Sequence, residues 1–147
     1  MNITICGSIA FYDEMLVIRK RLEQIGHQVK LPPSEVKDGN GKMIPVKEYY
    51  FIRKGEINNT GWILDREEEA MRLHFQKVEW GDAVLILNYE KNNVLNYIGA
   101  NTLLEMGLAF HLNKKLFLLN NIPEISYKEE IFGMKPIVIN NDLKKIK

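Results

Sequence analysis

One carboxylate interrupts a long apolar stretch of the sequence. Glu105 is the only charged residue within residues 103–110. A helix that is apolar on nearly all sides is buried, and an unpaired charge inside it is costly. Glu105 therefore either serves a site or faces solvent in the first turns of its helix, where the helix dipole favours it. Gly107 costs about 1 kcal/mol in a helix interior and predicts close approach of another backbone or a ligand.

Polar groups also follow two predicted strands. In the loop after the first strand, backbone N–H groups at the start of the next helix can bind an anion or a sugar hydroxyl, and Ser8 and Asp13 can add side-chain hydrogen bonds. Asp13 and Glu14 can alternatively do no more than offset the helix dipole. Asn88 follows the third predicted strand and opens an asparagine-rich loop, which by itself indicates turns.

Several familiar chemistries are absent from the sequence. There is no phosphate-binding P-loop, no G-x-G-x-x-G after the first strand, no H-E-x-x-H and no G-x-S-x-G. His27, His74 and His111 are scattered, and we interpret them as surface or packing residues. The single cysteine, Cys6, excludes an internal disulfide and an all-cysteine zinc site, and it favours a reduced, cytoplasmic compartment. No metal and no cofactor are expected.

These candidate residues must be positioned by alternating strands and helices. Short apolar or β-branched runs predict strands at residues 3–6, 28–31, 83–87, 116–119 and 136–139. Apolar periodicity predicts helices at residues 11–25, 66–79 with a capping-box-like start at Asp65, 101–112, and 127–132. Residues 144–147 are expected to be a solvated tail.

This order predicts an α/β fold with one domain. We expect a flavodoxin-like (Rossmann-like), mainly parallel five-stranded sheet with helices on both faces and with residues 3–6 as a central strand. Ligands of such open sheets bind beyond the carboxyl ends of the strands. That rule selects residues 7–13, 88–99 and 120–121.

The segment 33–61 is the least regular part of the chain. We expect an irregular insertion or lid there, with a short helix at residues 46–54 and a mobile turn at 37–42 that orders over the site when ligand binds. A variable surface excursion is the alternative. The aromatic run Tyr49, Tyr50 and Phe51, together with Trp62, is expected to supply exposed apolar surface for a homodimer.

Composition limits the partners. The 147 residues suit one domain, with 46% hydrophobic and 27% charged residues and a formal charge of +1. No strong net field points to nucleic acid or an anionic membrane. Apolar runs are far shorter than the ~20 residues that span a bilayer. We expect a small-molecule ligand, no nucleic acid and no membrane.

Three segments together resemble a known family. Gly7-Ser8-Ile9-x-Phe11-x-Asp13 after the first strand, residues 82–88, and Glu105-x-Gly107-x-Ala109 are similar to the nucleoside 2-deoxyribosyltransferase superfamily, which includes the 2′-deoxynucleoside 5′-monophosphate N-hydrolases. The resemblance covers most of residues 1–147 except 33–65.

The resemblance implies a function and a set of site residues. Glu105 would be the nucleophile that attacks the anomeric carbon of a (deoxy)ribosyl group and expels the base, followed by water or a second base. The implied substrate-binding residues are Gly7, Ser8, Ile9, Phe11, Asp13, Asn88, Gly99 and Asn101. The family also implies a homodimer and a nucleoside or nucleotide substrate.

The chain departs from the family at three places. Gly99 stands where the transferases carry a loop acid that helps the leaving base, and Ala10-Phe11-Tyr12 replaces the Arg-Gly-Gly-like phosphate loop of the hydrolases. The helix before the third strand lacks the usual aspartate. Two functions stay open: N-glycosidic bond cleavage or transfer, and a nucleotide- or nucleoside-binding module without catalysis. A structural interaction protein is disfavoured, because the polar residues cluster at the strand ends. A second ionisable group beside Glu105, from Asp13, Glu90 or a neighbouring subunit, would favour the enzyme.

Overall fold

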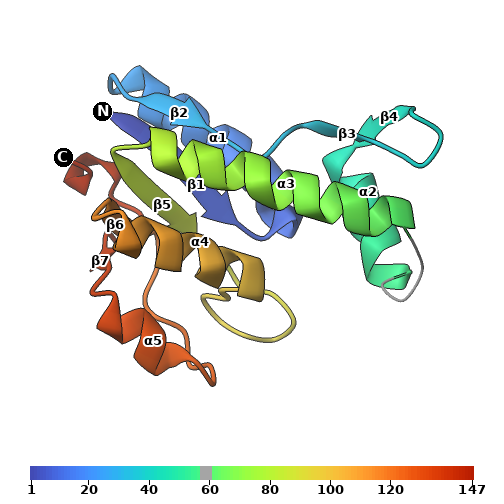
Figure 1. Cartoon of the computed structure of the whole chain (residues 1–147). Helices are drawn as coiled ribbons and strands as arrows, with labels where there is room; N and C mark the ends of the chain where they lie inside the picture. Colours follow the sequence, from blue (N-terminus) through green and yellow to red (C-terminus); the bar gives the residue numbers. More distant parts are fainter. Residues whose placement is uncertain (57–60) are drawn as a thin grey trace.

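The computed structural model describes residues 1–56 and 61–147 and confirms the predicted α/β fold (Figure 1). Five parallel strands form one sheet in the order β2-β1-β5-β6-β7. The strands are β1 (Asn2–Gly7), β2 (Gln28–Lys30), β5 (Ala83–Leu87), β6 (Lys115–Leu118) and β7 (Ile137–Val138). This is the predicted flavodoxin-like order, but β5 rather than β1 takes the centre of the sheet, and β1 is the inner strand beside it.

The two inner strands are held close together at their carboxyl ends. All five residues of β5 are buried, as the continuous apolar run predicts. In the β1–β5 ladder Gly7 pairs with Leu87. A Cβ atom on Gly7 would lie 2.8 Å from the Leu87 carbonyl oxygen, so only glycine fits at the point where the chain leaves β1.

Helices cover both faces of the sheet (Figure 1). They are the 3-10 turn η1 (Ile9–Phe11), α1 (Tyr12–Gln24), α3 (Gly61–Trp80), α4 (Ala100–His111) and α5 (Lys128–Gly133). Side chains alternate between the faces of β1, so that Ile3 and Ile5 pack in the same cluster as Met15 of α1. Cys6 points the other way, into the cluster that contains Val78 of α3 and Met106 of α4.

The segment predicted to be irregular has more regular structure than expected. An antiparallel hairpin, β3 (Glu35–Lys37) and β4 (Met43–Pro45), precedes α2 (Val46–Gly55). The carboxylate of Asp38 accepts hydrogen bonds from the backbone N–H groups of Asn40 and Lys42, which fixes the turn. Gly39 lies against the Trp62 ring. Ordering of this turn over a ligand stays a prediction, and residues 57–60 of the segment lie outside the described residues.

Two sequence expectations about helix ends and the tail are wrong. Helix α3 already includes Gly61, so Asp65 lies inside it and cannot be its cap. The tail forms the 3-10 turn η2 (Leu143–Lys145), and the spacing of Leu143 and Ile146 lets both pack into the core cluster that contains Ile3. Two apolar residues three positions apart are enough to anchor a short terminal turn.

Candidate functional site

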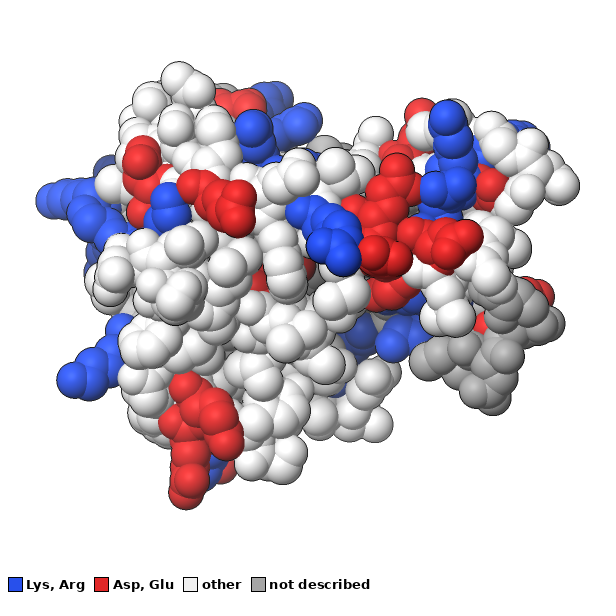
Figure 2. Space-filling model, in the orientation of Figure 1, with Lys and Arg blue, Asp and Glu red and all other residues white. Residues whose placement is uncertain are grey.

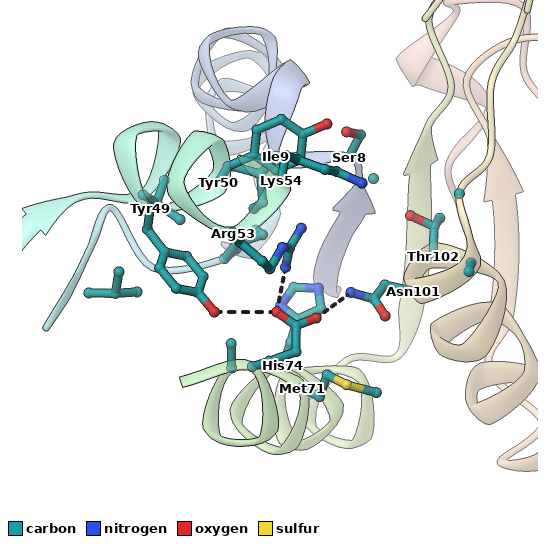
Figure 3. A pocket seen from close by; sticks show the side chains of 18 of the residues that line it. Ser8, Ile9, Tyr49, Tyr50, Arg53, Lys54, Met71, His74, Asn101 and Thr102 are labelled. Atoms are coloured by element: carbon teal, nitrogen blue, oxygen red, sulfur yellow. Dashed lines mark hydrogen bonds and ion pairs between the residues drawn. The ribbon is translucent and has the colours of Figure 1, made fainter. Parts of the chain in front are cut away.

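A cavity of about 460 Å³ opens where β1 and β5 end. Its walls come from the loop after β1, from α2, from α3 and from the start of α4 (Figure 3). The size falls in the range of small-molecule sites, roughly 300–1,000 Å³. The polar and aromatic groups that matter here form three neighbouring sets: a buried cluster around Glu105, a hydrogen-bonded carboxylate at Glu67, and a cationic wall at Lys91.

Glu105 projects from α4 into the most buried part of this cavity. Its side chain is 12% exposed, against 23% for Glu67. Burial raises the pKa of the Glu105 carboxyl to about 8, and a hydrogen bond from the Cys6 thiol opposes this by a smaller amount. The carboxyl is therefore mostly protonated at pH 7. No Lys or Arg nitrogen lies within 4 Å of it in the described part of the chain.

Two further ionisable groups stand beside Glu105. Nε2 of His74 lies 3.3 Å from Sγ of Cys6 and 3.8 Å from Oε1 of Glu105. Burial, and less strongly the charge of Lys77, lowers the pKa of His74 to about 4, so the imidazole is neutral at pH 7. Burial also raises the pKa of the Cys6 thiol. The three groups thus meet in their neutral forms.

Glu67 is the second carboxylate of the cavity, and its partners Tyr49, Arg53 and Asn101 are labelled in Figure 3. It accepts hydrogen bonds from Asn101 at 2.9 Å, from the Arg53 guanidinium and from the Tyr49 hydroxyl at 3.4 Å. Burial alone would raise its pKa, but the hydrogen bonds from Asn101 and Arg53 outweigh burial and lower the pKa. Glu67 is consequently an ionised, immobilised carboxylate that orients α2 and α4 around the cavity.

The third set of groups is cationic and aromatic and forms a wall of the cavity around Lys91. Nζ of Lys91 donates a hydrogen bond to Oγ of Ser8 at 2.8 Å and lies 5.0 Å from the ring centre of Tyr50 and 4.9 Å from that of Tyr97. Nζ of Lys54 lies 5.5 Å from the centre of the Tyr50 ring. Neither lysine has a carboxylate within 4 Å among the described residues. This wall can receive an anionic group and a planar ring.

Six of the nine sequence-predicted residues line the cavity. They are Gly7, Ser8, Ile9, Gly99, Asn101 and Glu105. The other three lie elsewhere. The Phe11 ring packs edge-on against Tyr89, and the exposed Asp13 pairs with Lys47 at 2.8 Å. Buried Asn88 joins the ends of β5 and β6 by accepting from the Asn120 N–H and donating to the Asn121 carbonyl.

Sequence reasoning missed the cysteine–histidine pair and the place of α2 in the cavity wall, although α2 itself matches the helix predicted at residues 46–54. The rings of Tyr49 and Tyr50, expected as exposed dimer surface, are buried at 3% and 8% exposure because they form the cavity wall, and only Phe51 is exposed. Arg53 and Lys54 lie one helical turn further along α2, a spacing that signals a shared face.

The group beside Glu105 also differs from the expectation. Neither Asp13 nor Glu90 lines the cavity, and His74, interpreted as a surface or packing residue, takes that place together with Cys6. Close approach at Gly107 is not seen either, because a Cβ atom there would meet nothing within 4 Å in the described chain.

Comparison with known proteins adds no assignment. No protein-family model matches the sequence, and no curated protein matches it. Among the described residues, no helix has the length and apolar character needed to cross a membrane.

Proposed function

We propose that this protein cleaves or transfers the N-glycosidic bond of a nucleoside or nucleotide, with Glu105 as the nucleophile. The observation that carries the proposal is the position of Glu105: a carboxyl group without a cationic partner, at the buried end of a ligand-sized cavity. Structural carboxylates in such positions are normally paired, as Glu67 is with Arg53. A carboxyl group kept unpaired and open to a cavity is suited to covalent chemistry.

The remaining groups of the cavity suit the rest of such a substrate. The rings of Tyr50 and Tyr97 line the cavity on either side of the Lys91 ammonium and can border a base or a sugar there. Lys91 and Lys54 offer ammonium groups for a phosphate, and the hydroxyl of Ser8 can bond a sugar or phosphate oxygen. The cationic wall therefore favours a phosphorylated nucleoside over an uncharged one.

The reaction would proceed by double displacement. An oxygen of the ionised Glu105 carboxylate attacks the anomeric carbon, a carbon–oxygen bond forms, and the carbon–nitrogen bond to the base breaks. The electron pair passes to the base, which leaves with a proton from solvent. Water then attacks the same carbon, releases the sugar and restores the carboxylate, or a second base does so in a transfer. The attack requires the deprotonated form, so the raised pKa of Glu105 couples activity to pH.

A binding module with the same cavity and no catalysis is the second candidate. Two observations favour it: Gly99 offers no acid to assist the leaving base, and Glu105 is mostly protonated at pH 7. In that case the protonated carboxyl would act as a hydrogen-bond donor to a ligand. Thermal-shift binding without base release would identify this function.

Base release is the experiment that tests the proposal. The protein is incubated at pH 8 with a panel of nucleosides and nucleoside monophosphates, and free base is measured by chromatography. We expect release by the wild type and by Glu124→Gln, whose carboxylate is exposed and pairs with Lys128 away from the cavity. We expect no release by Glu105→Gln, although ligand binding persists. Turnover by Glu105→Gln at the wild-type rate contradicts the nucleophile.

We further propose that the protein is a cytoplasmic homodimer that pairs through the outer face of α4. Leu104 is 51% exposed, and Gly107 and Leu108 follow it on the same stripe of the helix. In the orientation of Figure 2 this region carries few charged side chains. A cytoplasmic compartment would keep the thiol of Cys6 reduced. Sedimentation of wild type and Leu104→Glu tests the pairing: a dimer that the charge dissociates supports it, and a wild-type monomer at micromolar concentration rejects it.

A further inference from the structure

Three side chains from three separate elements converge at the buried end of the cavity. Cys6 comes from the end of β1, His74 from α3 and Glu105 from α4. Their ligand atoms, Sγ, Nε2 and a carboxylate oxygen, all lie within 4.8 Å of one another. Cys6 is fully buried, His74 is 5% exposed and the Glu105 side chain is 12% exposed. Such a convergence cannot be read from the sequence, because the three residues are widely spaced along the chain.

Two distances within this cluster can be compared with those of a metal-ligand set, and one of them falls in the range. In tetrahedral zinc sites the Zn–S distance is about 2.3 Å and the Zn–N and Zn–O distances are about 2.0–2.2 Å, which places the ligand atoms roughly 3.3–3.6 Å from one another. Here Sγ of Cys6 and Nε2 of His74 are 3.3 Å apart, and Nε2 and the nearer oxygen of Glu105 are 3.8 Å apart. A movement of the Glu105 carboxylate by roughly half an ångström would bring its oxygen to the distance from Nε2 of His74 that two ligands of one zinc ion have.

We propose that Cys6, His74 and Glu105 form a binding site for a borderline-soft divalent cation of the Zn²⁺ type. A thiolate and an imidazole select against Mg²⁺ and Ca²⁺, which prefer all-oxygen ligands, and the single carboxylate completes a three-residue set. The sequence alone, with one cysteine and scattered histidines, led to the opposite expectation that the chain holds no metal.

The site would keep one coordination position open. His74 and Glu105 both line the cavity, whereas Cys6 lies behind them. Three protein ligands with an accessible fourth position is the arrangement of zinc sites that bind water or a substrate atom. The cation would engage the same carboxylate oxygens that the proposed glycosidic reaction needs, so metal binding and nucleophilic attack by Glu105 would exclude each other. The cation site itself does not depend on that reaction.

Cobalt absorption tests the site without any activity measurement. The full chain is stripped of metal with a chelator under a non-thiol reductant and titrated with CoCl2. We expect a near-ultraviolet thiolate-to-cobalt charge-transfer band and visible bands of a tetrahedral Co²⁺ complex that saturate at one equivalent. Because Cys6 is the only cysteine, a charge-transfer band can come from no other residue. Zn²⁺ should abolish the bands by displacement, and excess Mg²⁺ should not.

Matched variants assign the other two ligands. Cys6→Ser should lose the charge-transfer band, and His74→Gln and Glu105→Gln should each weaken Co²⁺ binding at least tenfold. His111→Gln, which removes an exposed histidine outside the cavity, should bind as the wild type does. Absence of the band in the folded wild type overturns the site. Unchanged affinity in both His74→Gln and Glu105→Gln overturns the three-residue assignment, and base release that persists without a cobalt band refutes the cation site alone.

Discussion

Replacing Glu105 with Gln is expected to change how the free energy of unfolding depends on pH. Gln has nearly the shape of the protonated carboxyl group but cannot ionise. In the folded wild type, burial raises the pKa of Glu105 from an ordinary 4.5 to about 8. Between pH 4.5 and 8 the folded state binds one more proton at Glu105 than the unfolded state does. The contribution of this proton to stability is fully present below pH 4.5 and is lost as the pH rises to 8. The variant lacks this loss.

The size of the effect follows from the proton count. One extra bound proton lowers the free energy of unfolding by about 1.4 kcal/mol for each pH unit. His74 acts in the opposite sense, because its pKa is lowered from 6.5 to about 4 and the unfolded state takes up its proton first. The two contributions cancel between about pH 4.5 and 6.5, and from pH 6.5 to 8 the wild type should lose about 2 kcal/mol.

Urea denaturation followed by tryptophan fluorescence measures this dependence at several pH values. Wild type and the Glu124→Gln control should lose stability in parallel above pH 6.5. Glu105→Gln should instead gain stability between pH 4.5 and 6.5, where His74 acts alone, and stay level above that. Identical pH dependence in Glu105→Gln and the wild type would refute a buried Glu105 with a raised pKa.

Four other outcomes are expected. In metal-free buffer, kcat/KM for base release should rise roughly tenfold per pH unit from pH 6 and level off above about pH 8, because the attacking Glu105 carboxyl has a pKa of about 8. A pH-independent profile contradicts attack by this carboxylate. Lys91→Gln should weaken binding of a nucleoside monophosphate by roughly ten- to a hundredfold and leave the nucleoside unaffected, as calorimetry would show. At concentrations below those at which protomers pair, Gly107→Ala should stabilise the fold by roughly 0.5–1 kcal/mol, because its Cβ meets open space within the single chain. Gly7→Ala should cost about 1–3 kcal/mol, because its Cβ would clash with the Leu87 carbonyl. Denaturation midpoints measure both.

The fold could be predicted because its signals are local. The continuous apolar run of β5 and the periodicity of α1 and α4 depend on neighbouring residues only, and their order determines a parallel α/β sheet. Glu105 stood out for the same reason, as a charge in an apolar helix. The strands β3 and β4, which flank the predicted turn at 37–42, escaped prediction because three-residue strands give almost no periodic signal.

The rest of the site depends on long-range packing. His74 is one histidine of three in the sequence, and only the packing of α3 against β1 and α4 brings it to Cys6 and Glu105. Tyr49 and Tyr50 have side chains that suit an interface as well as a cavity wall, and their burial is determined by where α2 docks. The residue types alone do not tell whether Tyr49 and Tyr50 lie at an interface or in a cavity wall.

The most direct test of the central claim is the mass of the protein during turnover. The protein is incubated at pH 8 with a nucleotide whose sugar carries fluorine at C2, which slows breakdown of the glycosyl intermediate, and is then quenched in acid and digested. We predict a mass increase equal to the glycosyl group on the peptide that contains Glu105, and none in Glu105→Gln. If base is released while that peptide stays unmodified, or if the group is found on another residue, Glu105 is not the nucleophile.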